Sequence, residues 1–271
     1  DSFNTAVGHG AGESVTTGTQ NTYIGGLAGD AATASVENVA VGYQALSADT
    51  LGSKNVAVGR MALLSQNFST ATDTHNTAVG HNAGQQVTTG TSNTLIGSGS
   101  GDALTSGNSN VAVGHGALTT DTLGDRAVAI GLNALAAQNF TTSFDNYNVG
   151  IGYTAGAAVT TGANNTFVGG LAGTGSTSGG SNTGIGYNSL AANAVTNFNT
   201  AVGANSMASA VDGGRNDAHG YNALTADTKG GRSSAFGFGA LGTQNFTTVT
   251  TVYNAAFGYS AGTAITTGVQ N

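Results

Sequence analysis

A five-residue phrase, Asn-Thr-Ala-Val-Gly at residues 4–8, recurs through the whole chain at nearly constant spacing. The glycine that ends the phrase occurs in fifteen copies between Gly8 and Gly258, and most neighbouring copies are seventeen residues apart, as Gly8 and Gly25 are. Three of the steps are twenty-one residues long instead, and the first of them runs from Gly59 to Gly80. A fixed period of this length is typical of repeat proteins, in which each unit stacks on its neighbours.

The long steps divide the chain into super-repeats that begin with similar phrases. Residues 4–75 and 76–147 contain four units each, residues 148–253 contain six, and residues 254–271 form a partial copy. We therefore predict a single repeat domain over residues 1–271, produced by duplication of a four-unit block.

Each unit has the pattern of a short β-strand followed by tight turns. Thr-Ala-Val or Val-Ala-Val before the glycine is a β-branched run bounded by Asn and Gly. The 45 glycines and the absence of a helical apolar period argue against helices. Because one such unit buries too little to be stable alone, neighbouring units must stack. The sequence predicts an all-β fold, a β-solenoid or parallel β-roll of about fifteen coils, roughly 70 Å long at ordinary strand spacing.

Two positions of the unit are expected to form ladders along the stack. Asparagine stands four residues before the glycine in thirteen of fifteen units, where its amide can bond the next coil. The glycine is expected where a side chain would collide with packed backbone. Four residues after it, Leu, Met or Gly should face the interior. The glycines assigned to this structural ladder are Gly8, Gly25, Gly42, Gly59, Gly80, Gly97, Gly114, Gly131 and Gly152.

These Asn-Thr/Val-Ala-Val-Gly units, followed by Ala-Gly or Ala-Leu, resemble the head repeats of trimeric autotransporter adhesins of the YadA type. They are equally similar to the repetitive shafts of bacteriophage tail fibres. The resemblance covers essentially the whole chain. It implies a left-handed β-roll assembled as a homotrimer, with a role in adhesion or reach on a cell surface, outside the cell or on a virion.

A row of large side chains directly follows the glycine in many units. Stacking would align these side chains as a stripe that could bind glycans, because amphipathic rings suit sugar faces. The alternative is that the stripe packs against a neighbouring chain or shields turns. The candidates are His9, Tyr43, His81, His115, Tyr153, Tyr187, Tyr221 and Tyr259.

Each long step contains the same insert, Gln-Asn-Phe followed by Ser or Thr. Extra residues in a solenoid coil must leave it as a loop. Because the asparagine lies in an Asn-X-Ser/Thr motif, the loop could be glycosylated or contact a partner. Alternatively, the phenylalanine covers the coil edge and the asparagine makes a turn. The three asparagines are Asn67, Asn139 and Asn245.

Charge and residue content limit the chemistry that the chain can offer. A net charge of −7 with only six Lys and Arg gives no basic surface for nucleic acid. No apolar run approaches the roughly 20 residues of a membrane span. Cysteine is absent, the five histidines lie at most one per coil, and glycine-rich stretches lack a following helix for phosphate. We expect no catalytic residue, no cofactor, no metal and no enzymatic activity.

Three functions remain open. The first is a structural fibre or adhesin segment, a rod for surface attachment or reach. The second is a subunit of an extracellular filament that polymerises head to tail through uncapped coils. From Gly258 across such a junction to Gly8 of the next copy, the spacing would equal that of the long steps. The third is ice binding by a threonine array, although paired threonines such as Thr16-Thr17 recur only once per super-repeat.

Overall fold

The computed structural model describes residues 2–271, which fall into two compact units. The first unit runs to Ile130 and includes Asn139–Asp145, and the second comprises Gly131–Gln138 and Asn146–Asn271. Both are built from short parallel β-strands, and the described residues contain no helix.

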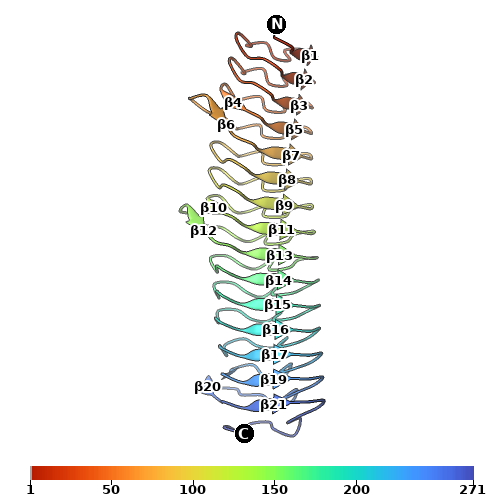
Figure 1. The fold of residues 1–271 in the computed structure, drawn as a ribbon, viewed down its shortest axis with the longest axis vertical. Helices are drawn as coiled ribbons and strands as arrows, with labels where there is room; N and C mark the ends of the chain where they lie inside the picture. Colours follow the sequence, from red (N-terminus) through yellow and green to blue (C-terminus); the bar gives the residue numbers. More distant parts are fainter. Residues whose placement is uncertain (1) are drawn as a thin grey trace. The chain divides into compact units, whose positions relative to one another are not determined.

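The first unit has one main sheet of eight parallel three-residue strands (Figure 1). In sheet order these are β1 (Thr5–Val7), β2 (Thr22–Ile24), β3 (Val39–Val41), β5 (Val56–Val58), β7 (Thr77–Val79), β8 (Thr94–Ile96), β9 (Val111–Val113) and β11 (Val128–Ile130). Two small sheets accompany it, β4 (Gly52–Ser53) with β6 (Thr72–Asp73), and β10 (Gly124–Asp125) with β12 (Phe144–Asp145).

The second unit has a main sheet of seven parallel strands. Their order is β13 (Val149–Ile151), β14 (Thr166–Val168), β15 (Thr183–Ile185), β16 (Thr200–Val202), β17 (Asp217–His219), β19 (Ser234–Phe236) and β21 (Ala255–Phe257). The small sheet here pairs β18 (Gly230–Gly231) with β20 (Thr250–Thr251).

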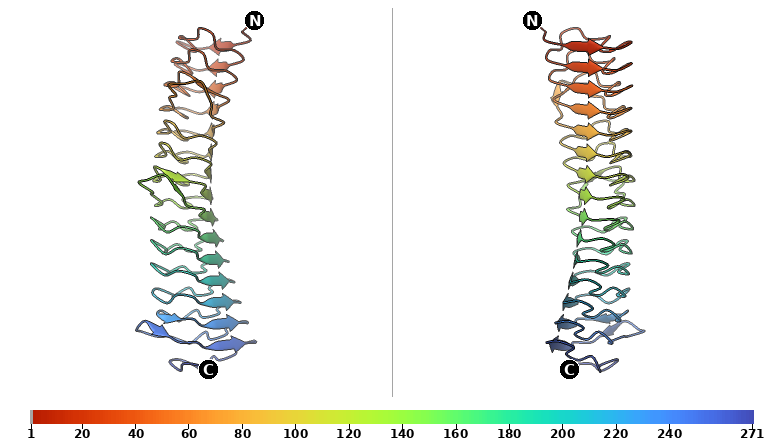
Figure 2. Two further views of the ribbon diagram at one scale, coloured as in Figure 1. Left: turned by 60° about the vertical axis from the view of Figure 1, so that its left-hand side comes forward. Right: turned by 90° about the vertical axis from the view of Figure 1, so that its right-hand side faces the viewer.

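Neighbouring main strands pair at equivalent positions of successive repeats. Thr5 pairs with Thr22 across an ordinary step, and Val56 pairs with Thr77 across a long one. Within each unit the strands therefore lie one above the next (Figure 2). These pairings confirm the predicted all-β parallel solenoid of about fifteen turns, with a repeat of about seventeen residues.

The central residue of a main strand points into the coil, while its two neighbours point outward. In most coils the centre is Ala or Gly, and the residue four positions after the ladder glycine is a buried Leu or Met; we call these leucine coils. This confirms the inward position expected from the sequence. The buried side chains are Leu46, Leu63, Leu118, Leu135, Leu190, Met207, Leu224 and Leu241.

Three coils fill the interior differently, because the strand centre is Tyr23, Leu95 or Phe167; we call these large-centre coils. Glycine then replaces leucine both in the large-centre coil and in the coil before it. A Cβ atom on Gly29 would lie 2.4 Å from the ring of Tyr23, so only glycine fits there. The six glycines are Gly12 and Gly29 around Tyr23, Gly84 and Gly101 around Leu95, and Gly156 and Gly173 around Phe167.

Stacked glycines bring the backbones of successive coils into close contact. A Cβ atom on Gly8 would lie 2.6 Å from the carbonyl oxygen of Gly25, and one on Gly80 would lie 2.5 Å from that of Gly97. Both residues also have φ angles in the left-handed region, +129° and +144°. The same geometry recurs at Gly25, Gly42, Gly59, Gly97, Gly114, Gly131 and Gly152.

The asparagines form a buried hydrogen-bond ladder inside each unit. The Oδ1 atom of Asn21 accepts a bond from the backbone N–H of Asn38 at 2.9 Å, and its Nδ2 atom donates to the carbonyl of Ser35 at 2.8 Å. One side chain thus joins its own coil to the next and satisfies a turn carbonyl. Ala127 and Ser233 occupy the two positions that lack asparagine, and their N–H groups still donate to Asn110 and Asn216.

Candidate functional site

The positions that follow the ladder glycines form a row, which we call the post-glycine row, and the structure exposes its large side chains. In the first unit small residues such as Gly26 and Ser98 interrupt the row. Two consecutive members of the row contact each other, since Nη1 of Arg60 lies 3.2 Å from Nε2 of His81. The predicted candidates, all exposed, are His9, Tyr43, His81, His115, Tyr153, Tyr187, Tyr221 and Tyr259.

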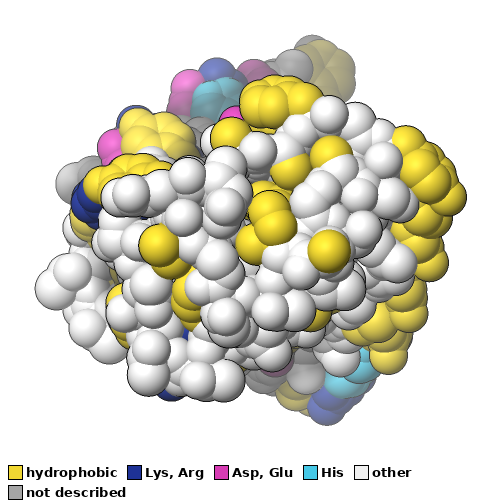
Figure 3. Space-filling model, turned by 90° about the horizontal axis from the view of Figure 1, so that it is seen from below, with side chains coloured by type: hydrophobic (Ala, Val, Ile, Leu, Met, Phe, Trp, Pro, Cys, Tyr) yellow, Lys and Arg dark blue, Asp and Glu magenta, His cyan; other side chains and the backbone are white. Residues whose placement is uncertain are grey.

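In the last three coils of the second unit, the post-glycine row becomes a continuous stack of rings. The centroids of Tyr221 and Phe238 lie 5.2 Å apart, and those of Phe238 and Tyr259 lie 5.1 Å apart. Two residues earlier in each coil, His219, Phe236 and Phe257 form a second stack at 4.6 and 4.9 Å. Seen from the C-terminal end, hydrophobic side chains gather along one edge (Figure 3).

Stacking decides which rings can accept a sugar. In a stack, neighbouring rings cover each other's faces and leave mainly edges to solvent, whereas a sugar packs against a ring face. Tyr153 and Tyr187 are 57% and 58% exposed, and only Gly170 separates them along the row. No ring among residues 2–271 stacks on either of them, so no aromatic neighbour covers their faces.

The coils of the long steps place their inserts away from the main strands, where β4 and β6, β10 and β12, and β20 lie in Figure 1. The insert phenylalanines are buried: Phe68, Phe140 and Phe246 are 7–8% exposed. Asn67 and Asn245 are exposed and Asn139 is half-buried. Each asparagine accepts a hydrogen bond at 3.0 Å from a threonine hydroxyl of the preceding coil, Thr50, Thr122 or Thr228.

A buried carboxylate lies beneath the first insert, in the row of residues seven positions after the ladder glycine, which we call the corner row. Oδ2 of Asp49 accepts a bond from Nε2 of Gln66 at 2.6 Å, and Oδ1 accepts one from the N–H of Gly52 at 2.9 Å. Oε1 of Gln66 in turn accepts a bond from Asn76 at 2.8 Å. Burial outweighs these bonds and raises the pKa of Asp49.

The partnership repeats in the second unit, where Nε2 of Gln244 donates to Oδ2 of Asp227. No sequence motif predicted that a glutamine one coil later would bond each aspartate. A signal did exist: an Asp stands in the unit before every long step, and a Gln stands one ordinary repeat later, at the same position of the unit that contains the long step.

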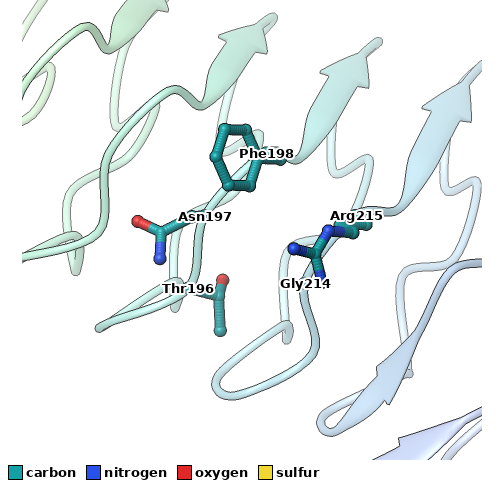
Figure 4. A pocket seen from close by; sticks show the side chains of 5 residues that line it. All are labelled: Thr196, Asn197, Phe198, Gly214 and Arg215. Atoms are coloured by element: carbon teal, nitrogen blue, oxygen red, sulfur yellow. The ribbon is translucent and has the colours of Figure 1, made fainter.

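The second unit also holds a cavity of about 210 Å³ that no sequence motif predicted. Five residues from two adjacent coils line it: Thr196, Asn197, Phe198, Gly214 and Arg215. Figure 4 shows the ring of Phe198 and the guanidinium group of Arg215 facing the same space, while the amide of Asn197 points away from Arg215. The carbon Cζ of Arg215 lies 5.7 Å from the centroid of the Phe198 ring. This is within the range of a cation–π contact.

Phe198 and Arg215 both belong to the residues five positions before the ladder glycine, which we call the pre-strand row. These residues have φ angles between +49° and +66° although none is glycine. That backbone turns their side chains outward, and most of them are exposed. The next two members, Arg232 and Tyr253, form a second cation–π pair at 5.5 Å.

Ionic groups are few in the described residues. Lys54 lies 2.6 Å from Asp73, Arg126 pairs with Asp145, and Nε2 of His219 lies 2.8 Å from Asp217. Within residues 2–271, no three His, Asp or Glu side chains converge closely enough to hold a metal ion. The same residues include no helix of the length and apolarity that crossing a membrane requires.

Comparison with protein-family models, with curated proteins and with solved structures gave no match for this chain.

Proposed function

We propose that this chain is a structural segment of an extracellular or virion-borne fibre, a rod that serves attachment or reach. The observation that carries the proposal is the continuous ladder within each unit. The backbone N–H of Thr22 donates to Asn38 at 2.8 Å and that of Gly25 donates to Val7 at 2.8 Å, and equivalent bonds repeat coil after coil. Repetition of this kind converts sequence length into physical length. The proposed role is mechanical and adhesive, and it includes no reaction.

The outward face of the main sheets supports assembly of several copies. The last residue of each main strand in the first unit is Val or Ile and points outward; Val7 and Ile24 are 57% and 39% exposed. In the second unit Ile185 is 40% and Phe257 is 70% exposed. A row of apolar side chains along a sheet favours side-by-side packing with chains of the same repeat. We propose a homo-oligomer, with a trimer as the form implied by the adhesin resemblance.

Electron microscopy and solution mass test this proposal together. We expect negatively stained particles to be discrete rods of about 70 Å, the length that strand spacing gives for about fifteen coils. Light scattering should give a constant mass of two or more chains across a dilution series. Compact particles without an elongated outline would contradict the rod, and a mass of one chain at every concentration would contradict the oligomer.

A head-to-tail filament is the second candidate, because in the described chain β1 and β21 each pair with one other strand only. All three residues of β1 are exposed, and Tyr259 beside β21 is 79% exposed. If the last coil of one copy stacked on the first coil of the next in the register of the repeat, however, Gly262 would lie next to Ala6 of that next copy. Elsewhere every glycine at that position adjoins Tyr23, Leu95 or Phe167. Micrometre filaments that dissolve on dilution would favour this candidate over discrete rods.

A further inference from the structure

The cavity between the coils of Phe198 and Arg215 combines an aromatic ring with a guanidinium group. The ring of Phe198 is 58% exposed and forms one wall. Asn197 uses its Oδ1 atom to accept a bond from the N–H of Gly180 at 2.6 Å. This bond holds the amide on the side of the preceding coil, away from Arg215 (Figure 4).

The second group is a guanidinium without a carboxylate partner. Three of the six cationic residues of the chain, Arg215, Lys229 and Arg232, lie in two successive coils. In the described chain none of the three forms an ion pair, whereas Lys54 and Arg126 do. Arg215 instead rests against Phe198, which fixes the position of its planar donors. A protein of net charge −7 thus presents a local site for an anion.

The size and openness of the cavity limit its ligand to a small one. At about 210 Å³ it is smaller than the ~300–1,000 Å³ of pockets that enclose drug-sized molecules. Asn197, Phe198 and Arg215 are all exposed, so a longer chain attached to the ligand could leave the cavity freely. A single sugar ring within a polysaccharide fits both conditions.

We propose that this cavity binds an acidic sugar residue. The anionic group of the sugar pairs with Arg215, because a guanidinium matches an oxyanion with two parallel hydrogen bonds. The apolar face of the sugar ring lies on Phe198. This inference names a ligand class for the proposed attachment role and rests on it. Its test measures binding alone, so the sugar site can fail while the rod remains.

The test is a titration of the intact chain with monosaccharides, followed by ligand-observed NMR or calorimetry. The probes are glucuronate, glucose 6-sulfate, neutral glucose and inorganic sulfate. We expect both acidic sugars to bind at least about tenfold more tightly than glucose, since a hydrogen bond to a charged group is worth that much. Glucuronate and glucose 6-sulfate together distinguish a carboxylate from a sulfate as the preferred anion.

Substitutions are chosen from residues that the pre-strand row already uses. Arg215→Asn and Phe198→Ser introduce residue types that the row already contains, as Asn164 and Ser181. Both side chains therefore suit the left-handed backbone of the row. Arg215→Asn should weaken acidic sugars about tenfold or more and leave glucose unchanged. Phe198→Ser should weaken acidic and neutral sugars alike. Lys54→Asn is the matched control, because Lys54 shares the row, has φ of +63° and carries the same charge.

Several outcomes would overturn the proposal. Equal affinity for glucose and glucuronate would remove the role of Arg215, as would an Arg215→Asn variant that binds like the wild type. An equal loss in Lys54→Asn would show a general effect of charge and not a site. Inorganic sulfate that binds as tightly as glucose 6-sulfate would leave an anion site without a sugar. Circular dichroism of each variant confirms that it has kept its fold.

Discussion

The large-centre coils and the leucine coils fill the same interior in opposite ways. In a large-centre coil the side chain of Tyr23, Leu95 or Phe167 crosses from the main strand to the far wall, and glycines stand opposite it. In a leucine coil the strand centre is small and the far wall supplies the bulk, as Ala40 and Leu46 do. One large side chain replaces two leucines, since it covers glycines in two successive coils.

The corner row differs between the two kinds of coil as well. Beside Tyr23 and Leu95 it contains apolar residues such as Ala32 and Leu104. In the leucine coils at a long step, the row contains a bonded pair instead, with Asp in the coil before the step and Gln in the coil of the step. The repeat therefore fixes the backbone of every coil, while the interior volume is balanced between neighbouring coils. Single positions vary widely because their neighbours vary with them.

The largest effect is expected from a substitution that imposes both packings on one coil. In Gly173→Leu the new Cβ would already lie 2.4 Å from the ring of Phe167, before the rest of the side chain is placed. The backbone does not forbid leucine there, since Leu190 has a similar φ of +50°. We expect the free energy of unfolding to fall by more than about 3 kcal/mol, beyond the usual range of overpacking. Urea denaturation followed by circular dichroism measures it.

A triple variant is the control for this substitution. Gly156→Leu, Phe167→Ala and Gly173→Leu together convert two coils to the leucine packing. Most of the lost stability should return, because the total interior volume is again close to that of a leucine coil. If the triple variant is no more stable than Gly173→Leu alone, the two packings are not interchangeable and the comparison fails.

A smaller loss is expected when a leucine coil loses its leucine and gains nothing in return. Leu118 is fully buried, so Leu118→Ala leaves a cavity next to Ala112. We expect a decrease of about 3 kcal/mol in the free energy of unfolding, within the range of buried leucines. The exposed Leu132 provides the control, and Leu132→Ala should change the free energy by less than about 0.5 kcal/mol. Similar losses in both variants would show that the interior of leucine coils is loosely packed.

Much of this architecture follows from the sequence because the repeat copies one set of contacts. The constant period fixes which residues lie above one another, so the parallel strands, the inward leucines and the close approach of backbone at Gly8 could be derived. The period does not reveal backbone conformation. Leu46 and Lys54 adopt left-handed φ angles of +51° and +63°, which L-residues other than Asn and Asp seldom do. Only the turn geometry of the folded coil requires them.

The candidate surfaces were predicted less completely than the fold. The post-glycine row could be identified because large side chains recur at one position of the unit. Whether its rings stack, as Tyr221 and Phe238 do, depends on side-chain rotamers that no pattern records. The cavity arises where Phe198 is followed by Arg215 in the pre-strand row, and this order of residues occurs once along the row. The repeat pattern predicts features that recur in many coils, and it gives no sign of features that occur in one place only.

The asparagine ladder tests whether the two kinds of coil share one frame. Asn93 precedes the large-centre strand of Leu95, and Asn110 precedes a leucine coil, yet both donate to a turn carbonyl at 2.8–2.9 Å. Asn93→Ala and Asn110→Ala should each lower the free energy of unfolding by about 1–3 kcal/mol, the cost of leaving buried groups unpaired. Equal losses would confirm a common frame. A clearly larger loss at one position would tie the ladder to the packing beside it.

The smallest effect concerns the corner row, where only leucine coils carry a carboxylate. Burial raises the pKa of Asp49 above the ordinary value of 3.8, so folding favours its protonated form. The stabilisation that results is fully present at a pH below the pKa of Asp49 in the unfolded chain. It is lost as the pH rises through the pKa of Asp49 in the folded protein. In the wild type, the urea midpoint should therefore fall as the pH rises between these two pKa values, and Asp49→Asn should make this fall smaller.

Asp73→Asn is the control with opposite sign, because a hydrogen bond from Lys54 lowers the pKa of that exposed carboxyl. Its stabilisation is present at higher pH and is lost as the pH falls. If Asp49→Asn leaves the slope unchanged, the Asp–Gln pair is neutral to proton binding, and the polar corner differs from the apolar one in hydrogen bonding alone.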